Sequence, residues 1–146
     1  MMAVRRLSRR GALLALASGL SVIGLPRAAW AGSYLNRAAL LVTQAGADAD
    51  YLRARVTDRE LASVIHKLAV ARLEAAGAME VPKEVAIAHP HLLLVLENYE
   101  RAADSAREGQ TQRFVIYQLR ARDEERTLRG VLKQLGWSLP PIKGDG

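Results

Sequence analysis

The side chains of this sequence that could carry chemistry are polar residues at positions where the apolar pattern predicts a buried helix face. His66, Tyr99 and Glu125 occupy such positions, and Arg72 lies on the same predicted helix as His66. A helix rises about 1.5 Å per residue, which brings the first three to similar heights in an antiparallel bundle, with Arg72 about a turn and a half away. Because polar groups are costly to bury, we predict that these four residues form one polar layer.

This polar layer has two interpretations. In the first it is structural: a satisfied layer that fixes the register of the helices, or an Arg72–Glu125 pair at the edge of the core. In the second it holds a metal ion between helices, although one histidine and one carboxylate are few ligands for a metal. The residue types favour the structural interpretation.

His89-Pro90-His91 is a second cluster with possible chemistry. Two imidazoles beside one proline could hold a copper or zinc ion weakly. The same residues equally suit a helix start, with His89 as the N-cap and His91 in the first turn. The chain has no Cys, which excludes disulfides, thiolate zinc, iron–sulfur clusters and c-type haem attachment, and we expect no other cofactor.

Four amphipathic segments must position these residues. The apolar spacing predicts helices over residues 34–56, 57–76, 90–107 and 111–135, with one short helical turn in the connection 78–89. Two tight turns and one longer connection favour an all-α, antiparallel up-down-up-down four-helix bundle over residues 32–137, with a flexible tail at 138–146. The apolar stripe predicted for the second helix is Leu61, Val64, Ile65, Leu68, Arg72 and Ala75.

The helix ends are marked by local signals. Ser33 is the predicted N-cap of the first helix, and Thr57 with Glu60 has the spacing of a capping box for the second. Gly77 and Gly136 each follow a helix as the residue that tolerates a left-handed conformation, with Trp137 as a hydrophobic latch.

The third helix begins with an unusually apolar run, Leu92-Leu93-Leu94-Val95-Leu96. A single buried stripe cannot include Leu93 and Leu94 as well as Leu92, and Ile116 also lies off the stripe of the fourth helix. Either the connection 78–89 covers these side chains or another chain does. We therefore treat Leu93, Leu94 and Ile116 as a possible interface with another protein or a second copy.

The first 31 residues have the layout of an export signal. Four arginines without an acid precede the uncharged apolar stretch 11–25, which is too short for an untilted membrane span, and Ala29-Trp30-Ala31 predicts cleavage after Ala31. Ser8-Arg9-Arg10-Gly11-Ala12-Leu13-Leu14 resembles the bacterial twin-arginine motif, in which Arg9 and Arg10 are the residues that the export machinery reads. Ala12 and Leu14 depart from that motif, and the alternatives are ordinary secretion and an uncleaved membrane anchor. The resemblance implies a periplasmic or secreted protein that contacts the membrane only through the signal helix before cleavage.

The positive charge of the chain belongs mostly to this segment. All 15 acidic residues but only 16 of the 21 basic ones follow residue 31, so the net charge falls from +6 to about +1 on cleavage. The electrostatic argument for a nucleic-acid partner disappears with it.

Two functions follow as expectations. The first is an exported, non-enzymatic bundle that binds another protein, such as an accessory subunit that carries a partner through the twin-arginine route. The second is a metal-binding or redox protein of the periplasm. The length and four-helix pattern resemble ferritin-like proteins in architecture only, because the paired Glu-x-x-His motifs of that group are missing.

Overall fold

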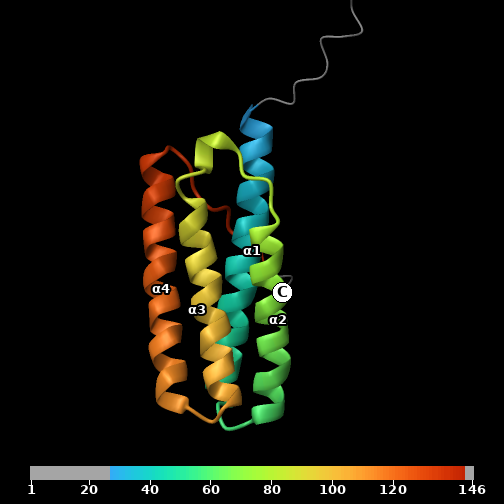
Figure 1. Cartoon of the computed structure of the whole chain (residues 1–146). Coiled ribbons are helices and arrows are strands. Elements are labelled where there is room, and N and C mark those ends of the chain that lie inside the picture. The colour runs from blue at the N-terminus through green and yellow to red at the C-terminus, as the bar shows by residue number, and fades with distance from the viewer. Residues whose placement is uncertain (1–26, 144–146) are drawn as a thin grey trace, which may run out of the picture.

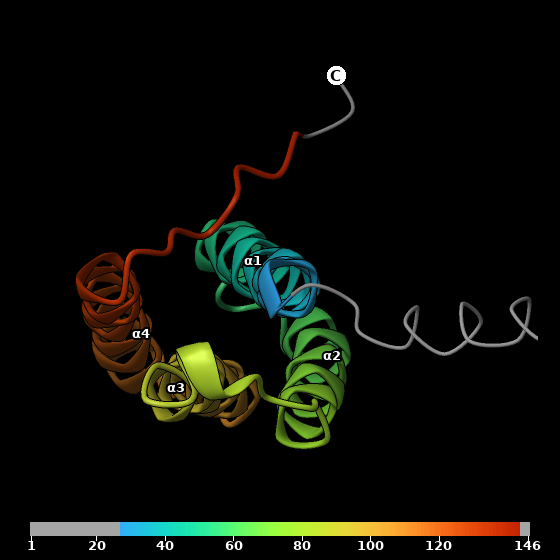
Figure 2. The same ribbon diagram turned by 90° about the horizontal axis from the view of Figure 1, so that it is seen from above.

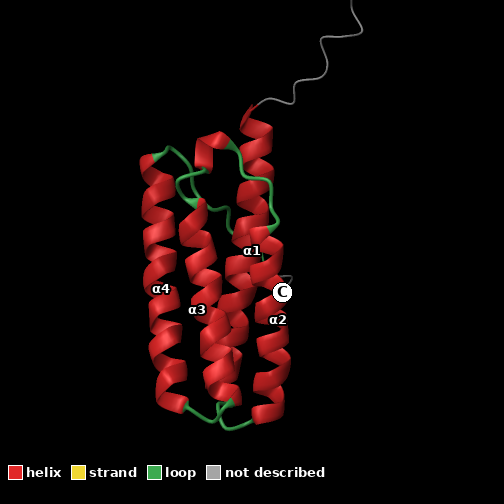
Figure 3. Cartoon of the chain, viewed as in Figure 1, coloured by secondary structure: helices red, strands yellow, loops and turns green. Residues whose placement is uncertain are grey.

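The computed structural model describes residues 27–143, and every regular element in this range is helical (Figures 1 and 3). Its elements are α1 (Arg27–Arg53), α2 (Arg59–Gly77), the short 3-10 helix η1 (Lys83–Val85), α3 (His89–Arg107) and α4 (Thr111–Gln134). Consecutive helices run in opposite directions and surround one axis (Figure 2). The predicted all-α four-helix bundle is confirmed.

A seven-residue repeat explains where α1 begins. Ala31, Ala38, Ala45 and Leu52 are each at most 3% exposed and form one buried stripe. The predicted start at Tyr34 is wrong, because this repeat extends the buried face to Ala31 and the helix begins at Arg27. The helix therefore crosses the boundary predicted between signal segment and bundle.

The buried face of α2 differs from the predicted stripe. Ala62, Ala69 and Ala76 are spaced by seven and buried, whereas Val64 and Leu68 are 55% and 45% exposed. Small side chains allow a helix to pack closely against its neighbours, so the alanine face turns inward and the larger residues remain outside. The prediction that Val64 and Leu68 lie in the core is wrong.

Both ends of α2 also differ from expectation. Asp58, rather than Thr57, is the N-cap, and its Oδ1 accepts a hydrogen bond from the Leu61 amide at 3.0 Å. Gly77 is the last residue of the helix and has no positive φ, and the Ala78 amide donates to the Glu74 carbonyl at 3.1 Å. The predicted left-handed role of Gly77 is therefore wrong.

A glycine in the left-handed conformation follows both α3 and α4. Gly109 and Gly136 have φ values of 78° and 85°. After Gly136, the Trp137 amide donates to the Leu132 carbonyl at 2.8 Å, and the Trp137 side chain packs against the core. This is the predicted helix stop with its hydrophobic latch.

The buried residues of α3 and α4 lie on one face of each helix. Those of α3 are Leu92, Val95, Leu96, Tyr99, Ala102, Ala103, Ser105 and Ala106. In α4 the buried residues are Phe114, Gln118, Ala121, Leu128 and Leu132, while Glu125 is only partly buried and Leu135 is exposed. Larger apolar side chains of α3 and α4 thus pack against the alanine-rich faces of α1 and α2.

The edge between α1 and α4 is closed partly by the C-terminal segment. α3 packs extensively against both α2 and α4, whereas α1 and α4 meet over a small area. The chain leaves α4 and crosses toward α1 (Figure 2), and Leu139 on this segment is 7% exposed and belongs to the main core. The predicted flexible tail, residues 138–146, therefore contains a core residue. Among the helices of residues 27–143, none combines the length and apolar character needed to cross a membrane.

Candidate functional site

The residues of the predicted export signal lie mostly outside the structure. Arg9 and Arg10 fall outside the described residues, so the twin-arginine motif stays a prediction. Ala29 and Ala31 of the predicted cleavage site lie in the first turns of α1, where Ala31 is fully buried.

The four residues predicted to form one polar layer do not share a network. His66 contacts α3, Arg72 pairs with Asp48 of α1 at 2.5 Å, and Glu125 pairs with Arg129 at 3.3 Å, one turn along α4. The predicted Arg72–Glu125 pair is wrong because α2 and α4 occupy opposite corners of the bundle (Figure 2).

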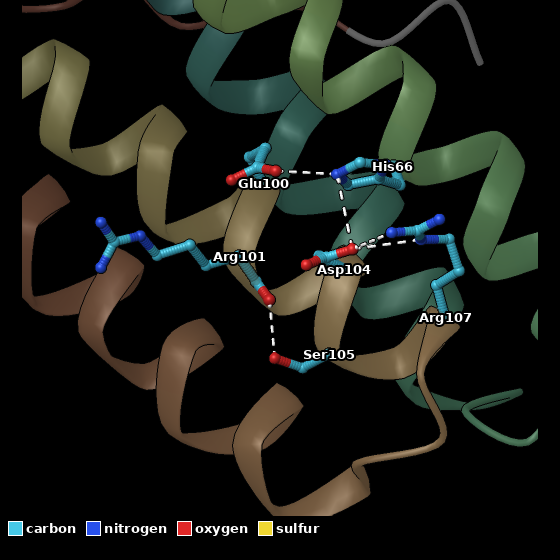
Figure 4. Close-up of polar contacts among 6 residues, drawn as sticks. All are labelled: His66, Glu100, Arg101, Asp104, Ser105 and Arg107. Atoms are coloured by element: carbon cyan, nitrogen blue, oxygen red, sulfur yellow. Dashed lines mark hydrogen bonds and ion pairs between the residues drawn. The ribbon is translucent and has the colours of Figure 1, made fainter.

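His66 connects α2 to α3 (Figure 4). Its Nε2 lies 2.7 Å from Glu100 Oε1 and 3.9 Å from Asp104 Oδ1. Arg107 donates to the same oxygen of Asp104, and this hydrogen bond raises the pKa of the guanidinium. Each of these side chains is at least partly exposed to solvent, so the network holds two helices in register at the bundle surface.

Another polar side chain in Figure 4, that of Ser105, has its partner within α3. The Ser105 hydroxyl donates to the backbone carbonyl of Arg101 at 2.8 Å, one turn earlier. Ser105 is buried, and this local hydrogen bond provides its partner.

Tyr99 is the buried member of the predicted layer. Its hydroxyl is buried without a hydrogen-bond partner among the described residues. Burial raises the pKa of Tyr99 to about 12, and the positive charge of Arg122 lowers it by a smaller amount. A Cβ built on Gly46 of α1 would lie 3.3 Å from the hydroxyl oxygen. Because glycine has no side chain, the Tyr99 hydroxyl can occupy the space next to Gly46.

A polar cluster that sequence reasoning missed connects α1 to α4. The Gln118 amide, 2% exposed, donates to Asp50 Oδ1 at 2.9 Å, and Arg122 donates to Asp50 Oδ2 at 2.7 Å. This bond to Asp50 raises the pKa of Arg122. Sequence could have suggested it, because Asp48 and Asp50 flank the buried Ala49 and must therefore face different neighbouring helices.

His89 and His91 turn toward different helices. The Tyr34 hydroxyl of α1 lies 2.8 Å from His89 Nδ1, whereas His91 Nδ1 lies 3.4 Å from Glu124 Oε2 of α4. Burial lowers the pKa of His89, and a hydrogen bond to the Ala76 backbone raises it by a smaller amount. A neutral imidazole that accepts from Tyr34 fits these contacts. The predicted metal pair is thus split between two partners, and residues 27–143 contain no group of three or more side chains placed to hold a metal.

The predicted interface residues differ in exposure. Leu93 is partly buried and packs against the core, whereas Leu94 and Ile116 are 40% and 48% exposed. Leu119, one turn after Ile116, is 54% exposed. The guanidinium groups of Arg101 and Arg120 lie 5.9 Å and 5.4 Å from the Tyr117 ring on the same pair of helices. Leu119 follows Tyr117 by two positions and therefore lies on another side of α4. We call the following five residues the α3–α4 face: Leu94, Arg101, Ile116, Tyr117 and Arg120.

A cavity of about 490 Å³ lies between the N-terminal part of α1, the end of α2 and the connection that follows α2. Its walls include Trp30 and Tyr34 from α1 and Met79 from the connection. The charged residues of the wall are one base and two acids: Arg37, Glu80 and Glu84. Sequence analysis did not find this cavity, because it depends on how residues 78–84 fold back against α1.

The chain matches no protein-family model, and no curated protein or solved structure is significantly similar to it.

Proposed function

We propose that this chain is an exported, non-enzymatic helical-bundle protein that binds another protein through the α3–α4 face, in the periplasm or outside the cell. The observation that carries the proposal is the composition of that face. It combines two exposed aliphatic side chains, Leu94 and Ile116, which are 40% and 48% accessible, with a tyrosine between two arginines. Aromatic residues and arginines are enriched in protein interfaces and dominate their binding energy.

The polar groups of the bundle support a binding role rather than catalysis. His66 pairs with Glu100 of the next helix, and Gln118 is hydrogen-bonded to Asp50 across the α1–α4 edge. Helix packing explains these contacts, so we assign none of these residues to a catalytic site. We propose no resident cofactor.

The export part of the proposal rests on the sequence. Arg9 and Arg10 precede an uncharged apolar stretch and an Ala-x-Ala tripeptide. The twin-arginine route carries folded cargo, so a folded bundle with an exposed apolar face could take a bound partner that has no signal of its own. In this form of the proposal, the chain is the small subunit that supplies the export signal.

Charge introduced on the α3–α4 face tests the binding proposal. In Leu94→Glu combined with Ile116→Glu, affinity purification from the native organism should lose the partner that the unchanged chain retains. Val64→Glu combined with Leu68→Glu is the matched control, because these residues are similarly exposed on α2. Loss of the partner in the α2 variant alone would assign binding to the other side of the bundle, and a solitary monomer in the native organism would contradict the proposal.

Substitution of the paired arginines tests the route. Arg9→Lys with Arg10→Lys preserves charge and should block export, because the twin-arginine receptor distinguishes a guanidinium from an ammonium group. Arg5→Lys with Arg6→Lys is the control and should be exported normally. Unchanged export of the first variant would assign the chain to general secretion.

A further inference from the structure

The cavity beside the start of α1 has the size of a small-molecule site. Its volume of about 490 Å³ lies within the range of roughly 300–1,000 Å³ that is typical of ligand pockets. It lies at the opposite end of the bundle from the α1–α2 and α3–α4 turns, next to the connection after α2 (Figure 1). Its residues do not overlap with the α3–α4 face.

The apolar part of the wall is aromatic and partly fixed. Tyr34 is 3% exposed, and its hydroxyl is held by His89 at 2.8 Å, so its ring cannot easily rotate away. Trp30 lines the same cavity with 49% of its surface exposed. Met79 adds a flexible thioether. A flat or branched apolar group could lie between these side chains and cover the exposed part of the indole.

Two of the three charged residues of the wall lack a partner of their own. Arg37 and Glu80 line the cavity, and neither has a hydrogen bond or ion pair with another described residue, whereas Glu84, the third, is not free. This contrasts with Asp48, Arg72 and Arg122, which pair with a neighbouring helix. A ligand with one carboxylate and one ammonium group would satisfy both charges at once.

We propose that this cavity binds a small zwitterion of the amino-acid type with an apolar side chain. Arg37 pairs with its carboxylate, Glu80 with its ammonium group, and the side chain lies against Tyr34 and Trp30. Cleavage after Ala31 would remove Trp30, so the proposed site is that of the uncleaved chain. This activity goes beyond the proposed function, because it uses another end of the bundle and needs no protein partner.

Three related probes test the assignment of the charges on the full chain. Isothermal titration calorimetry would compare L-phenylalanine with N-acetyl-L-phenylalanine, which lacks the ammonium group, and with L-phenylalaninamide, which lacks the carboxylate. We expect saturable binding of the free amino acid and about tenfold weaker binding of each derivative, because each loses one charge-assisted contact.

Variants of the wall identify the residues. Arg37→Gln should weaken binding of phenylalanine about tenfold and leave the amide unaffected, whereas Glu80→Gln should spare the N-acetyl derivative. Trp30→Ala should weaken binding of all three probes. Lys67→Gln and Glu108→Gln remove exposed charges outside the cavity and are the matched controls.

Unchanged melting temperatures would show that the variants remain folded. The proposal is overturned if neither L-phenylalanine nor L-leucine binds at about 10 mM. Equal affinity for all three phenylalanine probes, or unchanged binding in both Arg37→Gln and Glu80→Gln, would also overturn it.

Discussion

Replacing Gly46 by alanine tests how closely α1 approaches α3. Alanine in a helix interior is favoured over glycine by about 1 kcal/mol. Here the new Cβ would lie 3.3 Å from the Tyr99 hydroxyl oxygen, which is closer than ordinary van der Waals contact. Overpacking of this kind costs about 1–3 kcal/mol. We therefore expect Gly46→Ala to lower the free energy of unfolding by about 1 kcal/mol.

Removing the hydroxyl should reverse that effect. The Tyr99 hydroxyl is buried without a partner among the described residues, so Tyr99→Phe should stabilise the bundle by about 1 kcal/mol. In the Tyr99→Phe background, the Cβ added at position 46 no longer meets an oxygen. The double variant should then gain about 2 kcal/mol over the unchanged chain, which corresponds to a coupling energy of about 2 kcal/mol.

Urea unfolding followed by circular dichroism measures all four free energies, and 1 kcal/mol corresponds to about 4 °C in melting temperature. Gly130→Ala is the matched control, because a Cβ there meets nothing within 4 Å. It should stabilise α4 by about 1 kcal/mol with or without the Tyr99 hydroxyl. A coupling energy near zero between positions 46 and 99, or a clear loss of stability in Tyr99→Phe, would refute this reasoning.

Three further predictions concern the helix ends and interhelical pairs. Gly109→Ala and Gly136→Ala should each cost about 1–2 kcal/mol in urea unfolding, because both glycines have positive φ, and the exposed Arg59 side chain near Gly109 can move aside. Burial lowers the pKa of His89, so the unfolded chain binds a proton at this residue more tightly than the folded chain does. The melting temperature should therefore decrease as the pH is lowered from about 6.5. His89→Gln should make the melting temperature less dependent on pH in this range. Asp48→Asn and Arg72→Met should show a coupling energy of about 1 kcal/mol in a double-mutant cycle, because both side chains are partly exposed.

Periodicity predicted helices well where large apolar residues alone define one face. In α3, Tyr99 lies between the polar residues Asn98 and Glu100, and its helical spacing from Val95 and Leu92 defines the buried stripe. In α2, alanines compete with larger residues, and hydrophobicity alone favours Val64 and Leu68 for the core. The small side chains of Ala62 and Ala69 allow α2 to pack closely against its neighbours, so these alanines form the buried face in place of Val64 and Leu68.

The partners of polar residues were harder to predict than their positions. His66 and Arg72 were correctly recognised as unusual, but their partners, Glu100 and Asp48, depend on which helices are neighbours around the bundle axis. Height along the axis can be counted from the sequence, whereas lateral neighbours depend on the rotation of each helix and on loop paths. The cavity beside Trp30 depends on a loop path in the same way.

The position of Leu139 has a consequence for the order of folding. This side chain belongs to the core and lies on the segment that crosses between α4 and α1, so its contacts join distant parts of the chain. Contacts between distant residues form more slowly than local ones, because a long stretch of chain must first be closed into a loop. The turns between consecutive helices are local, whereas the edge between α1 and α4 is not. We therefore expect this edge to close after the helix turns have formed.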